Sequence, residues 1–323
     1  MIKDNSNNEY LDSQISPVNG YLSSTRNYVP YELVFKAVLP PLGYSVFSIK
    51  HLASVTNPKF KHSSLSMPGQ TNSFPSILPN FFIGNNQLRL EFDGNTGLIL
   101  NAQTLDASTG AVTNKIDLTQ NFYVYRSKER GYSSSKPSGA YRFSPIDNET
   151  KVISNKTTYK VFRGTEADEV HQVFSHWITQ VVRIYKGLNS VEFSWKIGPI
   201  PINGYYDNGF DVVTRIDTNL ATNNTFFTDS NGRETLRRIL NHRPTFNLLT
   251  TERYSSNYYP VTSFAFIHDH QMNQQVTLLP DRSVGCTSPK SGSLEFMLHR
   301  RLLFDDGYGM EEPLNEGKVT AFR

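Results

Sequence analysis

The sequence predicts an all-β protein, and three observations support that prediction. Many short segments alternate apolar and polar residues with a period of two, which is typical of strands with one buried face. Gly, Pro, Asn and Asp gather between these segments, as they do in tight turns. Aromatic residues make up 12% of the 323 residues, with 21 Phe and 17 Tyr, and this favours sheets over helices. Together these features indicate a large β-sandwich of two sheets.

The first eighty residues predict three successive parts. Residues 1–30 are rich in Asn and Ser, so we expect a polar, disordered linker there. Tyr31 to Leu52 indicates two strands around the turn Pro40-Pro41-Leu42-Gly43. The stretch from Thr56 to Pro79 has no apolar period and predicts a loop between domains. The predicted division is therefore a linker, a small β domain with its connecting loop, and a large β domain, at residues 1–30, 31–75 and 76–323.

The large domain begins with a predicted hairpin. Strands at 87–92 and 98–105 flank the turn from Asp93 to Gly97. Asp93 and Asn95 also suit a calcium loop, but the Glu that would close such a loop is absent, so the turn is favoured. One short helix is expected around 234–240. Further strands are expected at 121–125, 170–177, 179–185, 190–197, 211–217, 263–268, 275–279 and 293–298.

Charge and targeting features narrow the possible partners. The net charge is +3 and Lys and Arg are scattered singly, so nothing favours nucleic acid. No stretch approaches the roughly 20 apolar residues of a membrane span, and the N-terminus lacks the apolar core of a signal peptide. The single cysteine, Cys286, excludes an internal disulfide and is interpreted as a buried structural thiol. Weak support for a secretory route comes from three glycosylation sequons, at Asn148, Asn155 and Asn223.

Isolated polar motifs are better explained by structure than by chemistry. His268 and His270 have a spacing that could hold a metal, but their polar surroundings favour a hairpin tip, and no metal site is predicted in this chain. His171 and His176 have opposite parity along one strand and are interpreted as structural. Tyr258 and Tyr259 suit sugar binding and a sandwich edge, and the edge is favoured locally. Phosphate-binding loops, dinucleotide fingerprints and serine nucleophile elbows are absent.

A dense group of charges follows the last predicted strand, in "HRRLLFDDGYG". Asp305 and Asp306 could be taken for a glycosidase pair, which in a retaining enzyme lies about 5–5.5 Å apart across one bond. Adjacent residues in a strand or turn point away from one another, however. Pairing with Arg300 or Arg301 is the better local interpretation. The stretch is therefore not a complete catalytic centre.

The order of several motifs is more specific than any one of them. "PSGAYRFSP", "FFTDSNGRE" and "LHRRLLFDDGYG" occur in that order. From about Tyr31 to its end, the sequence closely resembles the C-terminal half of lysosomal-type α-mannosidases, glycoside hydrolase family 38. The "LHRRL" form resembles the lysosomal branch, because Golgi relatives usually carry Asp at the position of His299.

This resemblance implies a fold and an activity. Family members are retaining exo-α-mannosidases that form a covalent intermediate on an Asp, and they have a small β domain followed by a large β-supersandwich similar to galactose mutarotase. Their nucleophile and their zinc, held by His and Asp ligands, lie in an N-terminal α/β domain that is not found here. We therefore expect the C-terminal portion of an enzyme that removes terminal α-mannose from N-linked glycans, ending within its supersandwich and inactive alone. Its expected partners are a mannose-containing oligosaccharide and that catalytic domain, in the lysosome or secreted.

The resemblance also assigns site residues. Tyr141 is expected to reach a substrate hydroxyl from this β domain, and Arg301 to bind substrate or shape the pocket wall. Arg300, Asp305 and Asp306 are expected to support that wall as ion pairs. Two alternatives remain open at this point: a non-catalytic carbohydrate-binding β-sandwich, and a purely structural partner chain.

Overall fold

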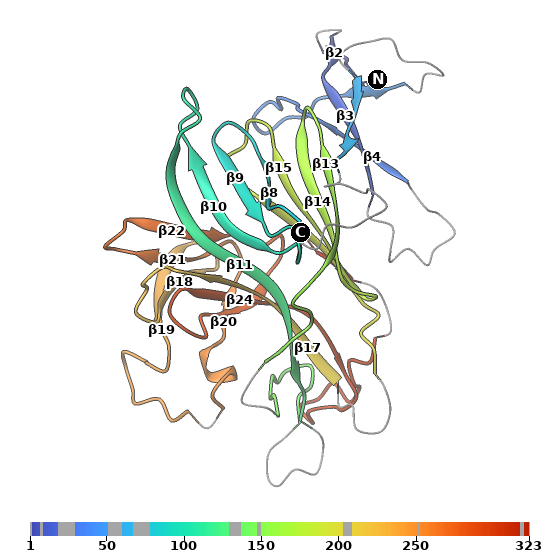
Figure 1. Ribbon diagram of the computed structural model, residues 1–323. Coiled ribbons are helices and arrows are strands. Elements are labelled where there is room, and N and C mark those ends of the chain that lie inside the picture. The colour runs from blue at the N-terminus through green and yellow to red at the C-terminus, as the bar shows by residue number, and fades with distance from the viewer. Residues whose placement is uncertain are drawn as a thin grey trace.

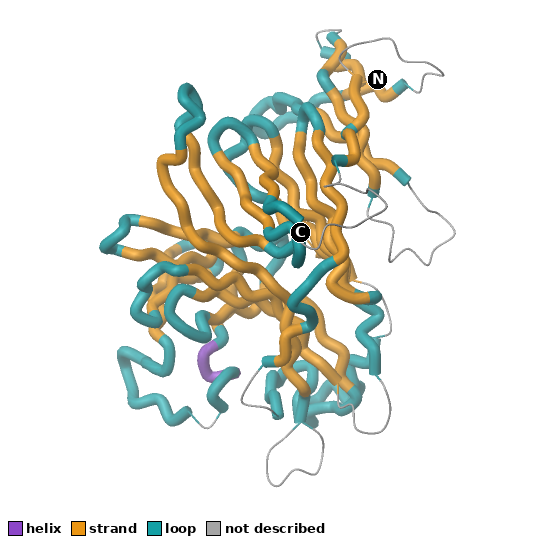
Figure 2. Tube along the Cα trace, in the orientation of Figure 1, coloured by secondary structure: helices purple, strands orange, loops and turns teal. Residues whose placement is uncertain are grey.

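The computed structural model describes residues 2–6, 9–18, 30–50, 60–66, 78–128, 137–146, 150–202, 209–250, 252–316 and 320–322. In these residues the regular structure is almost entirely β, which confirms the all-β prediction (Figure 1). The one described helical segment is a single 3₁₀ turn, Ser255–Asn257, coloured purple in Figure 2. None of the described segments is a helix with the length and apolar character needed to cross a bilayer.

The largest sheet extends across the whole molecule. Its longest strand, β11 (Val112–Arg126), runs from the upper to the lower end of Figure 1 and pairs with different neighbours along its length. In spatial order the sheet contains β20 (Tyr259–Val261), β23 (Val284–Thr287), β24 (Ser293–Leu302), β17 (Gly209–Thr218), β11, β10 (Ile99–Leu105), β9 (Leu88–Phe92) and β8 (Phe81–Gly84), with β12 (Lys151–Val152) paired to β11.

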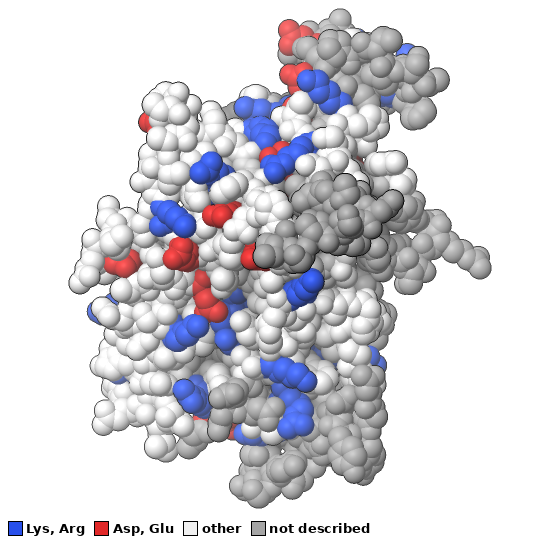
Figure 3. Space-filling model, in the orientation of Figure 1, with Lys and Arg blue, Asp and Glu red and all other residues white. Residues whose placement is uncertain are grey.

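Two further sheets complete the body of the molecule. The first lies beside β8 to β10 and contains β25 (Thr320–Phe322), β16 (Glu192–Ile197), β15 (Ile178–Tyr185), β14 (Ala167–Ser175), β13 (Thr158–Arg163) and β7 (Ser64–Leu65). The second, at the left in Figure 1, contains β19 (Glu234–Ile239), β18 (Thr225–Ser230), β21 (Ala265–Asp269) and β22 (Gln274–Leu278). Across the middle of the face in Figure 3, basic and acidic residues are interspersed.

The apolar core consists of two clusters between these sheets. One contains Phe122, Ile178 and Val212, and the other contains Leu118, Val182 and Ile216. Inward positions recur every second residue along a strand. On each of the strands β11, β14, β15 and β17, one inward residue therefore lies between a residue of the first cluster and a residue of the second. Those four residues are polar and buried: Gln120, Gln172, Gln180 and Thr214.

The four polar residues form a hydrogen-bonded layer across the core. The Gln180 amide donates to the side-chain oxygens of Gln120 and Gln172, at 2.8 Å in each case. Gln120 in turn donates to the Thr214 hydroxyl at 2.8 Å, and Gln172 donates to the carbonyl of Gly97 at 2.6 Å. Buried amides require such partners, and the three amide nitrogens have them, whereas the Gln180 side-chain oxygen has no partner among the described residues. The layer therefore joins the largest sheet, which contains β11 and β17, to the sheet of β14 and β15 by polar contacts as well as by apolar packing.

The predicted linker at residues 1–30 is wrong for the part that the structure describes. Two small sheets lie here, one of β2 (Tyr10–Leu11), β1 (Ile2–Asp4) and β5 (Phe47–Ile49), the other of β4 (Tyr31–Phe35), β3 (Ser13–Pro17) and β6 (Phe60–His62). Gln14 on β3 is buried, and its side-chain oxygen accepts the backbone N–H groups of Glu166 at 2.9 Å and Ala167 at 3.1 Å. The polar composition of this segment predicts disorder, but the buried Gln14 side chain attaches β3 to the backbone of residues 166 and 167.

A buried arginine fixes the second of these small sheets to the body. Arg183 on β15 contacts Glu169 at 3.0 Å and Glu192 at 2.9 Å, and its third contact is Glu32 on β4. The alternation of apolar and polar residues along β15 predicts one solvent-exposed face. Arg183 lies on that face, yet it is buried because β4 covers it. Three carboxylates around one guanidinium keep the charge compensated there.

The expected hairpin and most expected strands are confirmed. Asp93 accepts the backbone N–H groups of Asn95 at 2.9 Å and Thr96 at 2.7 Å, and Gly97 has a φ of 70°, so the segment is a turn as predicted. The helix expected at 234–240 is wrong, because β19 occupies it and pairs with β18. Its Arg and Leu residues suit a helix, but the hairpin turn at Asn231 and Gly232 decides the outcome.

We predict that Gln180→Ala destabilises the protein by roughly 2–4 kcal/mol, because it leaves two buried amide oxygens without a donor. Urea denaturation followed by tryptophan fluorescence measures this loss. The exposed Gln275→Ala on β22 is the matched control and should change the unfolding free energy by less than about 0.5 kcal/mol. Equal effects of the two substitutions would contradict the role of the amide layer.

Candidate functional site

The predicted site residues follow an irregularity in β24. The pairing of β24 with β17 shifts between Val212 and Val213, so that Leu298 is an extra residue on β24. Beyond this bulge, Arg300 lies opposite Asp211 and Arg301 lies opposite Phe210. Bulges re-aim the side chains that follow them and are common beside functional sites. Here the bulge sets which of the two arginines faces Asp211.

Arg300 joins the end of β24 to the loop at residues 137–146. Its Nε lies 2.7 Å from the Asp211 carboxylate, and its terminal nitrogens donate to the carbonyls of Gly139 at 2.8 Å and Arg142 at 3.1 Å. Burial raises the pKa of Asp211, and the contact with Arg300 opposes that rise. One guanidinium therefore holds a buried carboxylate and both sides of the loop that carries Tyr141.

Asp306 fixes the same loop from a second direction. Its buried carboxylate accepts the backbone N–H of Tyr141 at 2.7 Å and that of Tyr308 at 3.1 Å. A Cβ atom on Gly139 would lie 2.5 Å from the Asp306 side chain, so only glycine allows this approach. The Tyr141 backbone is thus held while its side chain stays 69% exposed.

The expected ion pairs of the two aspartates with the two arginines are wrong. The carboxylate partner of Arg300 is Asp211, and Asp306 accepts backbone N–H groups instead. Asp305 accepts the backbone N–H of Gly307 at 2.8 Å. Register decides this, because strand pairing brings Asp211 opposite Arg300, whereas the chain turns after Leu302. No local pattern in the sequence indicated Asp211.

Arg301 is held within the chain rather than directed freely to solvent. Its guanidinium donates to the carbonyl of Ile200 at 2.6 Å and to the side chain of Asn315 at 2.7 Å. These contacts join the end of β24 to two segments that are distant in sequence. Arg301 is therefore well placed to shape a wall, whereas Tyr141 has no hydroxyl partner among the described residues.

A buried carboxylate that sequence reasoning missed supports this region. Glu295 on β24 is fully buried, and it accepts the hydroxyls of Tyr125 at 2.6 Å and Tyr258 at 2.5 Å and the Arg215 guanidinium at 2.7 Å. Both tyrosine rings contact Phe143 of the 137–146 loop edge-on, with centroids 5.2 and 5.3 Å apart. Burial, with the neighbouring Glu295 charge, raises the tyrosine pKa values. Tyr258, considered as a sugar-stacking residue, is thus a support.

Glu252 holds the same loop by charge. Its carboxylate lies 3.2 Å from the Lys128 ammonium and 3.3 Å from the Arg142 guanidinium. Glu252 immediately precedes Arg253 and Tyr254 and lies close in sequence to Tyr258. The segment 252–258 is therefore a second missed element of the site, because nothing in its sequence indicates a contact more than one hundred residues away.

The other polar candidates lie elsewhere and keep structural roles. Cys286 is buried, and burial followed by the Glu295 charge raises its thiol pKa, in line with an inert structural thiol. His171 is buried and contacts Glu169 at 2.7 Å. His268 and His270 have ring centroids 4.4 Å apart. Within the described ranges, no three His, Cys, Asp or Glu residues are grouped to hold a metal.

The three sequons are placed unequally. Asn155 and Asn223 are exposed, whereas Asn148 lies outside the described residues. Asn223 has a φ of 51° and lies in the turn before β18. Exposure makes the two described asparagines accessible to modification.

The motif "FFTDSNGRE" is anchored in the fold by one aspartate. Asp229 is buried and accepts backbone N–H groups of Gly232 at 2.8 Å, Thr262 at 2.9 Å and Ser263 at 3.1 Å. Burial raises its pKa, but these hydrogen bonds, with one from the Thr262 hydroxyl, outweigh that effect and lower the pKa. Asp229 thus ties the β18–β19 turn to the segment between β20 and β21.

Comparison with known proteins points to one family. Residues 83–308 match the profile described as the glycosyl hydrolases family 38 C-terminal domain, and residues 11–49 match that of the lysosomal alpha-mannosidase-like central domain. The chain is 38% identical to lysosomal alpha-mannosidase of Mus musculus over 306 residues, covering 95% of this chain and 28% of that protein. For lysosomal alpha-mannosidase of Bos taurus the identity is 40%, covering 88% and 26%. For alpha-mannosidase of Canavalia ensiformis it is 36%, covering 88% and 27%.

These proteins are far longer than the matched region. The chain spans between about a quarter and a third of the length of each of these three relatives. Among solved structures, a galactose mutarotase-like protein from Lactobacillus casei aligns with 76% of this chain and 98% of its own, at 9% identity and a TM-score of 0.38.

We predict that Asp306→Ala loosens the 137–146 loop without unfolding the protein, because the Tyr141 N–H loses its acceptor. Hydrogen–deuterium exchange should accelerate at least about tenfold in a peptide covering residues 137–146, since such acceleration reports local opening. Asp305→Ala is the matched control and should leave that peptide unchanged. Unaltered exchange in Asp306→Ala would refute the proposed tether.

A second prediction concerns pH. The lowered pKa of Asp229 means that its carboxylate stabilises the fold above its ordinary value of 3.8, and that this contribution is lost as the pH falls towards the lower folded-state pKa. Asp229→Asn should therefore cost about 3 kcal/mol at pH 7 and progressively less below pH 3.8. Urea denaturation at pH 7 and pH 3 measures both values. The exposed Asp117→Asn should show neither effect, and a pH-independent loss would contradict the assignment.

Proposed function

The chain belongs to glycosyl hydrolase family 38, and on that premise we propose that it is the C-terminal β portion of a retaining exo-α-mannosidase. In this proposal the complete enzyme removes terminal α-linked mannose from N-linked glycans. The observation that carries it is the match of residues 83–308 to the C-terminal domain of the family, together with relatives that are named alpha-mannosidases. The chain contributes a wall of the substrate pocket, and the reacting groups come from another part of the enzyme.

An exposed apolar stretch supports the need for another domain. Residues 38–49 include six large apolar side chains that are more than half exposed, of which Leu42 and Val38 are the most exposed: Val38, Leu39, Leu42, Tyr44, Val46 and Ile49. Contiguous exposed apolar surface in a soluble protein is typical of an interface. We therefore propose that this stretch packs against the N-terminal catalytic α/β domain.

The proposed roles of Tyr141 and Arg301 differ in kind. The Tyr141 phenol is exposed on a rigidly held backbone, which suits a hydrogen bond to a mannose hydroxyl. The Arg301 guanidinium is engaged by Ile200 and Asn315, so its role is to position the wall. Arg300 and Asp306 act one step further from the substrate, by holding the loop.

The zinc of the family does not fit the described residues of this chain, because these contain no group of three candidate ligands. We propose that zinc and the nucleophilic Asp belong to the N-terminal domain, and no reaction step is assigned to residues of this chain. With the exposed sequons at Asn155 and Asn223, a lysosomal or secreted, glycosylated enzyme is the corresponding proposal for localisation.

The function is tested by measuring hydrolysis of 4-nitrophenyl α-mannoside with the complete protein and with this chain alone. We expect turnover by the complete protein and none by the isolated chain, because covalent catalysis requires the nucleophile that we assign to the N-terminal domain. Hydrolysis by the isolated chain would contradict the division of labour. Absence of hydrolysis by the complete protein, combined with mannose binding by this chain, would replace the enzyme with a carbohydrate-binding module.

The site residues are tested in the complete enzyme. Tyr141→Phe should reduce kcat/KM by about 5- to 30-fold, the loss expected for a hydrogen bond of roughly 1–2 kcal/mol. Tyr31→Phe, also exposed but on β4 of the small β domain and outside the stretch 38–49, is the matched control and should leave the rate unchanged. Arg301→Lys should raise KM through a displaced wall. A Tyr141→Phe enzyme with unchanged kcat/KM would remove Tyr141 from the substrate site.

A further inference from the structure

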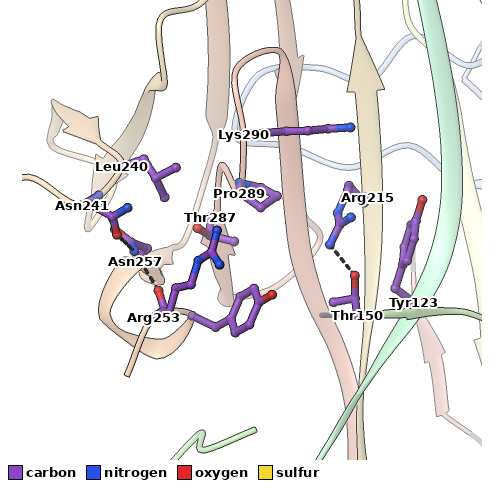
Figure 4. Close-up of a pocket in the computed structure, with 11 residues that line it drawn as sticks. Tyr123, Thr150, Arg215, Leu240, Asn241, Arg253, Asn257, Thr287, Pro289 and Lys290 are labelled. Atoms are coloured by element: carbon purple, nitrogen blue, oxygen red, sulfur yellow. Dashed lines mark hydrogen bonds between the residues drawn. The ribbon is translucent and has the colours of Figure 1, made fainter. Parts of the chain in front are cut away.

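A concave site lies beside the supports of the 137–146 loop. The pocket has a volume of about 320 Å³, at the lower end of the range for small-ligand sites. Figure 4 shows its two sides, one from the segment around Arg253 and Asn257 and the other from Tyr123, Thr150 and Arg215. Neither Tyr141 nor Arg301 lines this pocket. Nothing in the proposed mannosidase reaction uses it.

The charged side chains of the pocket are all cationic. Among the described residues that line it, three carry positive charge and none carries a carboxylate: Arg215, Arg253 and Lys290. Glu295 and Asp217 neutralise Arg215 and Lys290 from outside the lining, with contacts of 2.6 and 3.2 Å. Arg253 is exposed, and within the described ranges its guanidinium has no partner. The excess positive charge of the pocket therefore resides on Arg253.

The neutral lining residues can contact the hydroxyl groups and the ring of a sugar. Thr150 and Thr287 provide hydroxyl groups, and Tyr123 and Tyr254 provide aromatic surface. The Asn257 side chain is already committed, because its amide donates to the Asn241 side chain at 2.8 Å and to the Arg253 carbonyl at 2.9 Å. Those contacts fix the backbone from which Arg253 projects. The pocket is thus a shaped polar site with one unengaged guanidinium.

A free guanidinium in such a site matches one chemical group well. Arg presents two parallel N–H donors to phosphate or carboxylate oxygens, and this geometry is stronger than a single neutral hydrogen bond. Tyrosine rings and threonine hydroxyls match the C–H faces and hydroxyls of a sugar. We propose that this pocket binds an acidic monosaccharide unit, a sugar carrying a phosphate or a carboxylate, with Arg253 as the residue that reads the anion.

The test is binding of defined probes to the complete protein by isothermal titration calorimetry. The probes are glucose 6-phosphate, glucuronate and neutral glucose, with inorganic phosphate as competitor. At least one acidic sugar should bind more than about tenfold more tightly than glucose, the ratio expected for a charge-assisted contact. Its affinity should fall as salt is raised. Comparison of the titrations with glucose 6-phosphate and glucuronate decides whether the pocket prefers a phosphate or a carboxylate.

Variants locate that binding. Arg253→Gln should weaken the acidic sugar by about tenfold or more, and Lys290→Gln by a smaller factor because Asp217 already compensates its charge. The matched control is Arg237→Gln, an exposed arginine of β19 that does not line the pocket. Absence of binding by both acidic sugars, equal binding of glucose, or equal losses in Arg253→Gln and Arg237→Gln would each overturn the proposal. Mannosidase activity does not enter this test, so the two proposals fail independently.

Discussion

The burial of the Glu295 carboxylate is the constraint on which the lower half of the molecule depends. A carboxylate with no solvent contact must be matched by donors, and Tyr125, Tyr258 and Arg215 supply them. Each donor also contributes to a surface, because the two tyrosines hold Phe143 of the Tyr141 loop and Arg215 lines the cationic pocket. Removing the Glu295 charge would therefore disturb two surfaces that share no residue.

Satisfied and unsatisfied polar groups separate structural from functional roles in this chain. Asp211, Asp229 and Asp306 are buried with their donors in place, and each ties together segments that are distant in sequence. Tyr141 and Arg253 differ, because each is exposed on a backbone fixed by others and lacks a side-chain partner among the described residues. A fixed backbone that carries a side chain with no internal partner lowers the entropy cost of binding a ligand.

Alternation of side chains was enough to predict the all-β class and most strands, including β9, β10, β15 and β17, because period two is a local property. Sequence-based prediction failed where the outcome depended on distant partners. The polar composition before Tyr31 concealed Gln14, whose buried contacts lie across the fold. Asp211 faces Arg300 through strand register and a bulge, which no local pattern records. The segment 234–240 suited a helix locally, and pairing with β18 overrode that preference.

Different residues of the segment from Glu252 to Tyr258 serve the two proposed sites. Glu252 and Tyr258 hold the Tyr141 loop through Arg142 and Phe143, whereas Arg253 and Asn257 line the cationic pocket. A ligand on Arg253 would restrain the same backbone that carries Glu252. Shared backbone alone is not allostery, because a ligand shifts an equilibrium only by its difference in affinity between two states. Mannoside turnover with and without the acidic sugar would measure that difference directly, and Arg253→Gln would abolish any effect that arises in this pocket.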